Sequence, residues 1–293
     1  MYTQQLLGQG SGQYTTDPRS DGWAFWGDVS GITSENDYTD SCAYEISSAR
    51  VIVGADKDIN PNLLTGMALT IDSGTVDSSD ENDSGSLRSL QLGLYANIDF
   101  NNFFFNALVG YANSRGDVER IFSYTGNTVE SDVDGQSFMG RLSGGYDYRL
   151  GNWLIGPMGS ITGLMLQTSS IVEQGNSPLN LTIDDMDENR WYANLGARVA
   201  GHFLKGKIAL QPRIALGLQY GDNDPADMTA SFDGYSEVPF SITGVETLAT
   251  LITSEVGLAA YLNEQLSFNI SLLGEYGEDY DNYSASIGLK WDF

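Results

Sequence analysis

The last thirteen residues, DNYSASIGLKWDF at 281–293, decide the fold class. Apolar side chains occupy every second position from Tyr283 to Phe293, and small or charged side chains lie between them. Successive side chains of a β-strand point to opposite faces, so this segment has one apolar face that ends in aromatic residues and one polar face. Such a strand fits a boundary between lipid and water.

The same alternation recurs upstream in three long windows, at 89–100, 191–203 and 208–219. In each window Leu, Ile or Val alternates with Gly, Arg, Gln or Asn. Extended over the whole chain, the pattern predicts twelve strands and no helix of three turns. The strands are expected near residues 22–30, 43–54, 62–72, 87–99, 103–114, 136–149, 153–168, 189–203, 207–220, 248–262, 266–276 and 281–293.

Two kinds of connection alternate between these strands. The short ones lie at 57–60, 100–102, 150–152, 204–206 and 263–265, and a brief sixth lies near 277–280. The long ones are acidic or rich in Ser and Gly, and lie at 31–42, 73–86, 115–135, 169–188 and 221–247. Outer-membrane barrels have this layout, with short turns in the periplasm and long loops outside. The sequence therefore predicts an all-β, twelve-stranded antiparallel transmembrane barrel of the bacterial outer membrane, with both termini on the periplasmic side.

A soluble β-sandwich or propeller would also contain many strands and turns. Its strands would be five or six residues long, whereas most strands expected here run eleven residues or more. A bilayer requires about 9–11 tilted residues per strand. Aromatic residues also gather near the strand ends, as they do in interface girdles. Strand length and aromatic position therefore favour the membrane barrel.

Composition narrows the functional classes. The 293 residues include 39 acidic and 14 basic side chains, for a net charge of −25. No basic face is available to neutralise phosphates, which argues against nucleic-acid binding. No apolar run long enough for a transmembrane helix is present, and the first twenty residues lack the pattern of a signal peptide. The single cysteine, Cys42, excludes an intrachain disulfide and argues against a zinc cluster, so we expect no metal and no cofactor.

Several segments resemble, in order and with the expected spacing, the C-terminal β-domain of autotransporters. They are VGADK at 53–57, the run from Asn60 to LGLYA at 92–96, GRLSGGY at 140–146, WYANLG at 191–196 and GLKWDF at 288–293. The likeness covers about residues 22–293. No single one of these motifs is specific for the autotransporter β-domain, but their joint order across twelve strands is specific for it.

The resemblance implies a translocator, which exports an N-terminal passenger of the same polypeptide and anchors it in the outer membrane. It also implies a monomer that contacts outer-membrane lipid and lipopolysaccharide, its own passenger segment, periplasmic chaperones and the barrel-assembly machinery. That machinery would recognise an assembly signal on the last strand. The residues expected to form it are Tyr283, Ile287, Leu289, Trp291 and Phe293.

Family members usually thread a helix through the lumen before the first strand. Here residues 1–21 precede the barrel, and GQGSGQ at 8–13 is poor helix material. We therefore expect a linker or residual pore segment at 1–21 and the barrel at 22–293. Met1 is expected to begin a fragment, with the passenger outside it.

The lumen is the candidate functional site. Twelve strands about 4.8 Å apart and tilted about 40° give a diameter of roughly 24 Å, and inward side chains leave a bore of roughly 10–12 Å, about one helix wide. Side chains alternate between the two faces of each strand, and this alternation places the following charged residues on the inward face: Arg50, Arg141, Arg149, Arg198, Arg213, Glu255, Glu275 and Lys290. Either they form a hydrated wall that contacts a polar segment or plug, or they pair across strands as in any water-filled barrel.

Three other functional classes compete with a translocator. Barrel phospholipases and proteases need a base, usually His, oriented by an acid. The only histidine, His202, is expected at the short-turn end facing inward without such a partner, so we expect no catalytic residue and no enzyme. A channel for ions or small solutes is the main alternative. An adhesin acting through the loop 221–247 is the third. The acidic loops, such as 77–84, lack the spacing of a calcium hand and are expected to be solvated.

Overall fold

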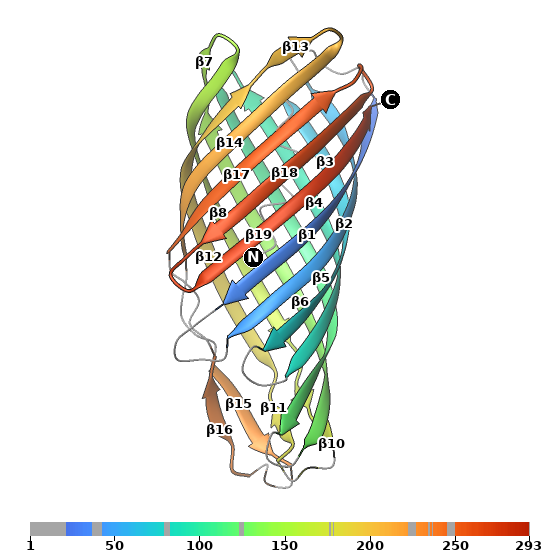
Figure 1. Ribbon diagram of the computed structural model, residues 1–293, viewed down its shortest axis with the longest axis vertical. Coiled ribbons are helices and arrows are strands. Elements are labelled where there is room, and N and C mark those ends of the chain that lie inside the picture. Colours follow the sequence, from blue (N-terminus) through green and yellow to red (C-terminus); the bar gives the residue numbers. More distant parts are fainter. Residues whose placement is uncertain are drawn as a thin grey trace.

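The chain folds into a long β-barrel with a small sheet beyond one end (Figure 1). The computed structural model describes residues 22–36, 43–78, 83–122, 126–175, 177, 179–221, 227–233, 235, 237–244 and 250–292. Within this part of the chain, no helix is long and apolar enough to cross a membrane.

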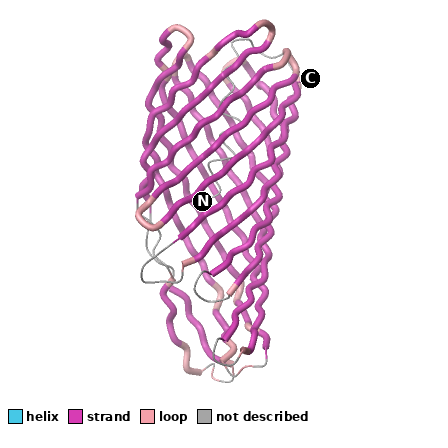
Figure 2. The backbone as a smooth tube through the Cα atoms, in the orientation of Figure 1, coloured by secondary structure: helices cyan, strands magenta, loops and turns pink. Residues whose placement is uncertain are grey.

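Twelve antiparallel strands form the barrel, each paired with its neighbour in sequence (Figure 2). They are β1 (Trp23–Asn36), β2 (Tyr44–Asn60), β3 (Leu63–Ser78), β4 (Ser84–Phe100), β5 (Phe103–Phe122), β6 (Asn127–Tyr146) with its continuation β7 (Tyr148–Leu150), β8 (Trp153–Thr168), β12 (Met186–Gly201) with its continuation β13 (Phe203–Lys205), β14 (Ile208–Gly221), β17 (Thr250–Tyr261), β18 (Leu266–Tyr276) and β19 (Tyr280–Asp292). β1 pairs with β19 from Ala24↔Asp292 to Asn36↔Tyr280 and closes the barrel. The predicted fold class is confirmed.

The outward faces of the strands are apolar. Leu195 and Leu216, for example, are 74% and 60% exposed. Outward aromatic residues lie at two heights along the barrel. On β19 the two heights are those of Tyr283 and Trp291, which are both exposed. These two residues are eight positions apart, about 27 Å along the strand or about 20 Å at a 40° tilt, close to the apolar band of an outer-membrane barrel. A face with this composition and height is suited to lipid.

One end of the barrel carries tight turns, and we call it the short-turn end (upper end in Figure 1). Asn101, Gly151 and Gly206 open three of these turns with positive φ of 56°, 60° and 68°. Two-residue hairpins need a left-handed residue to match the twist of their strands, and Gly and Asn adopt it most readily. The first and last strand residues, Trp23 and Asp292, lie at this same end.

At the opposite end, the long-connection end, the strands run further than the apolar pattern indicates. β5 and β6 each have 20 residues, which corresponds to about 66 Å of strand, far more than the 9–11 residues needed to cross a bilayer. The expectation of a loop over 115–135 is therefore wrong for most of that range. Beyond the membrane both strand faces meet water, so apolar alternation stops although the backbone ladder continues.

The other four expected loops also contain strand residues: β1 runs to Asn36 within 31–42, β3 and β4 extend into 73–86, and 169–188 and 221–247 contain short strands of their own. The strands β9 (Ile171–Val172), β11 (Leu181–Ile183), β15 (Asp227–Phe232) and β16 (Phe240–Thr243) form a four-stranded sheet at the long-connection end (Figure 1). β10 (Gln174–Gly175) pairs instead with the extended part of β6. Because these strands have two to six residues, their side chains are too few to display a period in the sequence.

Candidate functional site

Two strand breaks shape the lumen near the short-turn end. The break between β6 and β7 falls at Asp147, and that between β12 and β13 falls at His202. Pro157 on β8 and Pro212 on β14 lie across from these breaks. Proline has no N–H for the ladder, so it is tolerated where the pairing is interrupted. The amides of Asp147 and His202 instead donate to turn carbonyl oxygens, at 2.8 Å each.

Four arginine residues line a cavity of about 330 Å³ at this end of the lumen. They are Arg141 on β6, Arg149 on β7, Arg198 on β12 and Arg213 on β14, and we call them the arginine cluster. All four were predicted to face inward, and the structure brings them to one cavity.

Two members of the arginine cluster have carboxylate partners. Arg198 donates from Nε and Nη2 to Asp147 Oδ1 and Oδ2, at 3.1 and 2.7 Å. Its guanidinium also lies 3.6 Å from the ring centroid of Phe104. Arg213 Nε lies 2.7 Å from Glu255 Oε1. These pairs fix two of the four cations on the wall.

The other two members, Arg141 and Arg149, form no ion pair with any residue in the described part of the chain. Arg141 Nη2 donates to Ser160 Oγ at 3.1 Å. Its Nε is buried and has no hydrogen-bond partner, and the same is true of Arg213 Nε although it lies close to Glu255. Arg149 is exposed and is among the residues that line the cavity. Contact ion pairs therefore involve two of the four cations, whereas Glu275 and Glu255 act on Arg141 electrostatically without forming an ion pair with it.

The opposite wall contains a charge pair of another kind. Lys290 Nζ on β19 donates to Asp56 Oδ1 and Oδ2 on β2, at 3.0 and 2.9 Å, and so bridges β1, which lies between these strands. Tyr95 Oη donates to Asp56 Oδ2 at 3.1 Å, and Trp26 Nε1 donates to Tyr95 Oη at 2.8 Å. We call Trp26, Asp56, Tyr95 and Lys290 the seam network. Its Asp56 and Lys290 are only 1% and 6% exposed.

Glycines make room for the aromatic rings of the seam network. A Cβ on Gly54 would overlap the Trp26 indole, and one on Gly66 would overlap the Tyr95 ring. Ile52 and Leu108 pack in the same inward cluster. This apolar packing could not be predicted from the alternation of side chains, which assigns a residue to a face but does not show which inward residues touch. The alternation of glycine with inward aromatic residues on neighbouring strands was the available signal.

The remaining expected lumen residues are also buried in hydrogen-bonded pairs. Arg50 Nε donates to Asp72 Oδ2 at 2.8 Å, and Arg50 is 1% exposed. Glu275 Oε2 accepts a 2.9 Å hydrogen bond from Asn282 Nδ2. Both sites lie on the wall rather than in the cavity of the arginine cluster.

A second and larger cavity, of about 1030 Å³, lies toward the long-connection end. Small side chains dominate its lining, among them Ser47, Ser48, Ser73 and Thr75, with Arg88 as its charged member. The two cavities therefore differ in character: the larger is lined mostly by small neutral residues, and the smaller is lined by four arginines.

The expected assembly signal lies on the outward face of β19. Tyr283, Ile287, Leu289 and Trp291 are 46–53% exposed there. Phe293 lies outside the described residues, as does the expected linker 1–21.

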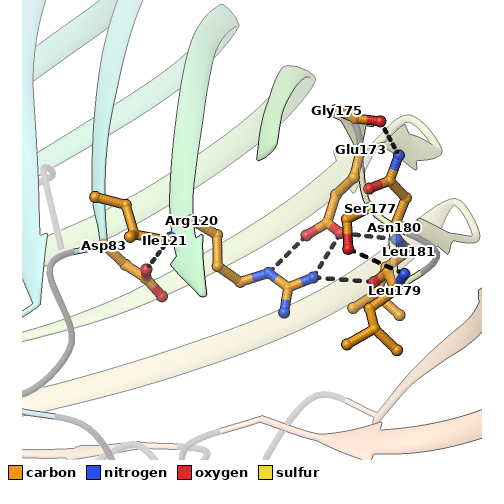
Figure 3. A network of polar contacts seen from close by, with 9 residues as sticks. All are labelled: Asp83, Arg120, Ile121, Glu173, Gly175, Ser177, Leu179, Asn180 and Leu181. Atoms are coloured by element: carbon orange, nitrogen blue, oxygen red, sulfur yellow. Dashed lines mark hydrogen bonds and ion pairs between the residues drawn. The ribbon is translucent and has the colours of Figure 1, made fainter. Parts of the chain in front are cut away.

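Polar contacts organise the long-connection end (Figure 3). Arg120 Nε and Nη2 on β5 donate to Glu173 Oε1 and Oε2, at 2.9 and 2.6 Å. Glu173 Oε2 also accepts from the Leu181 amide on β11 at 2.7 Å. Asp83 Oδ1 accepts from the Ile121 amide at 2.9 Å. Glu173 thus joins the small sheet to the β5–β6 hairpin. Among the described residues, no group of three His, Cys, Asp or Glu could hold a metal ion.

The chain is similar to known proteins along most of its length. The family model described as the autotransporter beta-domain matches residues 25–272. Outer membrane protein A of Rickettsia conorii is 21% identical over 264 residues, which cover 85% of this chain and 13% of that protein. Outer membrane protein B of Rickettsia typhi is 26% identical over 255 residues, 83% of this chain and 15% of that protein. The chain thus spans about an eighth of the length of these curated relatives.

Solved structures agree in fold. The translocator domain of the autotransporter NalP from Neisseria meningitidis matches with a TM-score of 0.76 at 14% identity, covering 94% of this chain and 90% of that one. The beta domain of the Bordetella autotransporter BrkA matches with a TM-score of 0.70 at 16% identity, covering 93% and 100%. The family match runs from β1 into β18 and confirms the resemblance drawn from the sequence. The chain therefore belongs to the autotransporter β-domain family, and it is an integral outer-membrane translocator domain.

Proposed function

We propose that this barrel exports and then anchors a passenger that precedes it in the same polypeptide. The observation that carries the proposal is the family match over 25–272 on a closed barrel. The greater length of the curated relatives supports it, because the chain matches only 13–15% of the first ones named above. The channel alternative is not favoured by this match.

The orientation and partners form part of the same proposal. The short-turn end faces the periplasm, and the small sheet faces the outside, because outer-membrane barrels place short turns on the periplasmic side. The outward residues of β19 and Phe293 are read by the barrel-assembly machinery after delivery by periplasmic chaperones. The barrel is a monomer in contact with lipid and lipopolysaccharide, and it carries out transport without catalysis.

The lumen residues contact the passing or resident chain. Arg50, Glu275 and Lys290 hold the wall, whereas Arg141, Arg149, Arg198, Arg213 and Glu255 face the narrow cavity. A polar, charged lining keeps the bore hydrated, so that an unfolded segment can exchange its hydrogen bonds with water during passage.

The test is a fusion in a Gram-negative host. A secretory signal and an epitope-tagged passenger are placed upstream of residues 1–293, and intact cells are probed with antibody and with external protease. We expect the epitope at the cell surface. A folded barrel in the outer membrane with the epitope retained in the periplasm would contradict the proposal. Removal of residues 280–293 is the control, because it deletes β19 and the assembly signal.

A further inference from the structure

The arginine cluster contains two arginines without ion-pair partners among the described residues, and a role in stabilising the barrel wall does not explain them. Buried cations in proteins are normally paired, because an unpaired charge in a dry site is costly. On the opposite wall this rule holds, since Lys290 contacts both oxygens of Asp56. In the arginine cluster, the half-buried Arg141 and the exposed Arg149 form no ion pair with any described residue, although acidic side chains outnumber basic ones 39 to 14 in the chain.

The geometry of the cavity provides for an anion. Asp147 and Glu255 hold Arg198 and Arg213 in place. Arg141 donates one hydrogen bond, from Nη2 to Ser160 Oγ, and forms no ion pair with a described carboxylate. Guanidinium groups present paired N–H donors that match the oxygens of carboxylates and phosphates.

Neutral donors complete the lining. Asn106, Ser143, Asn152 and Gln211 border the same cavity. Hydroxyl and amide groups can donate to further oxygens of an anion. The volume of about 330 Å³ lies at the lower end of the range of small-molecule pockets, about 300–1,000 Å³, and exceeds the needs of a single phosphate.

We propose that this cavity is a binding site for a multivalent oxyanion, with Arg141 and Arg149 as its principal cations. The oxygens come either from a small soluble anion or from carboxylate side chains of a peptide segment in the lumen. Both sources share the same chemistry at the site. The proposal does not depend on passenger export, because it can be tested on the barrel alone.

The experiment is calorimetric titration of the folded 293-residue chain in neutral detergent with pyrophosphate, with citrate and with the pentapeptide DDMDE. We expect saturable binding of at least one of these probes, weakened as salt is raised. The double variant R141Q/R149Q should reduce the affinity at least tenfold, and each single variant should reduce it about threefold to tenfold. Gln keeps polar donors in the cavity and removes only the positive charge.

The matched control is R115Q. Arg115 pairs with Asp134 at the long-connection end, where the two side chains are 80% and 60% exposed. This variant removes the same charge and should leave the affinity unchanged. Each variant is first shown to be folded by the heat-dependent shift of its band on a denaturing gel.

The outcomes separate the two sources. Binding of pyrophosphate or citrate identifies a soluble anion, and binding of the peptide alone identifies carboxylates of a chain segment. No saturable binding of any probe by the folded barrel would overturn the proposal. An equal loss of affinity in R115Q and in the double variant would also overturn it, because the effect would then be one of net charge.

Discussion

The two walls of the lumen place charge in opposite ways. On the seam wall, Lys290 and Asp56 are buried against each other and shielded by Trp26 and Tyr95. On the other wall, the arginine cluster surrounds an open cavity and contains more cations than carboxylate partners. A charge enclosed among its partners fastens strands, whereas a charge with unused donors beside a cavity is available to a ligand. The seam wall therefore fastens the closed barrel, and the wall of the arginine cluster is the one for which we propose contact with a ligand.

The largest effect should come from breaking the seam. Lys290→Met leaves the Asp56 carboxylate buried without its cation, and we expect a loss of about 3–5 kcal/mol in the free energy of unfolding. Denaturant unfolding in detergent micelles measures it. The double variant Lys290→Met/Asp56→Asn should recover much of the loss, because no buried charge remains.

Arg141→Met is the comparison from the other wall, and it should cost no more than about 1.5 kcal/mol in the free energy of unfolding, since only a hydrogen bond is lost. Equal losses in the two single variants would contradict the distinction between the walls.

A second, smaller loss of stability should come from overpacking the seam network without changing its charge. Gly54→Ala drives a methyl group into the Trp26 indole, and overpacking of this kind costs about 1–3 kcal/mol. The shift of the tryptophan emission spectrum would report displacement of the ring, and unfolding would report the stability. Gly140→Ala is the matched control, because its Cβ would meet nothing within 4 Å. Identical behaviour of the two variants would show that the ring does not lie over Gly54.

A third prediction sharpens the comparison inside the arginine cluster. Arg198→Met leaves Asp147 without its bidentate partner, in a site where the two side chains are 14% and 8% exposed. Because Arg198 lines the cavity, water can take its place beside Asp147, and we expect a loss of about 1–2 kcal/mol, below that at the seam. Asp147→Asn in the same chain should restore part of it. A loss as large as that of Lys290→Met would mean that both walls are structural.

Much of the barrel could be predicted from the sequence, because lipid imposes an apolar residue at every second position. The strand limits of β8 and β18 follow directly from that pattern. The extended hairpin of β5 and β6 could not be predicted in this way, since no lipid faces it. For the lumen, the alternation of side chains placed the arginines on the inward face but did not show which residues they contact there. The enclosure of Lys290 by Asp56, 234 positions away in the sequence, depends on closure of the barrel, which no local pattern encodes.

The smallest effect should come from the long-connection end. Arg120→Ala removes the partner of Glu173, but Arg120 is 30% exposed, and we expect a loss below about 1 kcal/mol in barrel stability. Its local effect should be larger, because Glu173 joins the small sheet to the β5–β6 hairpin. Limited proteolysis should therefore cleave the segment 169–188 faster in this variant. Unchanged cleavage would show that the pair does not hold the sheet. Arg115→Ala, at an exposed pair on the same hairpin, is the control.

Export and anchoring by this barrel is the central claim, and the mass of the native polypeptide in its outer membrane tests it most directly. The mass is measured before and after protease is added to intact cells. We predict a chain far heavier than the 31.8 kDa of these 293 residues, which external protease trims to a protected fragment of barrel size. A polypeptide of barrel mass from the outset, made without a longer precursor and unchanged by protease, would contradict the claim, because nothing would have been exported.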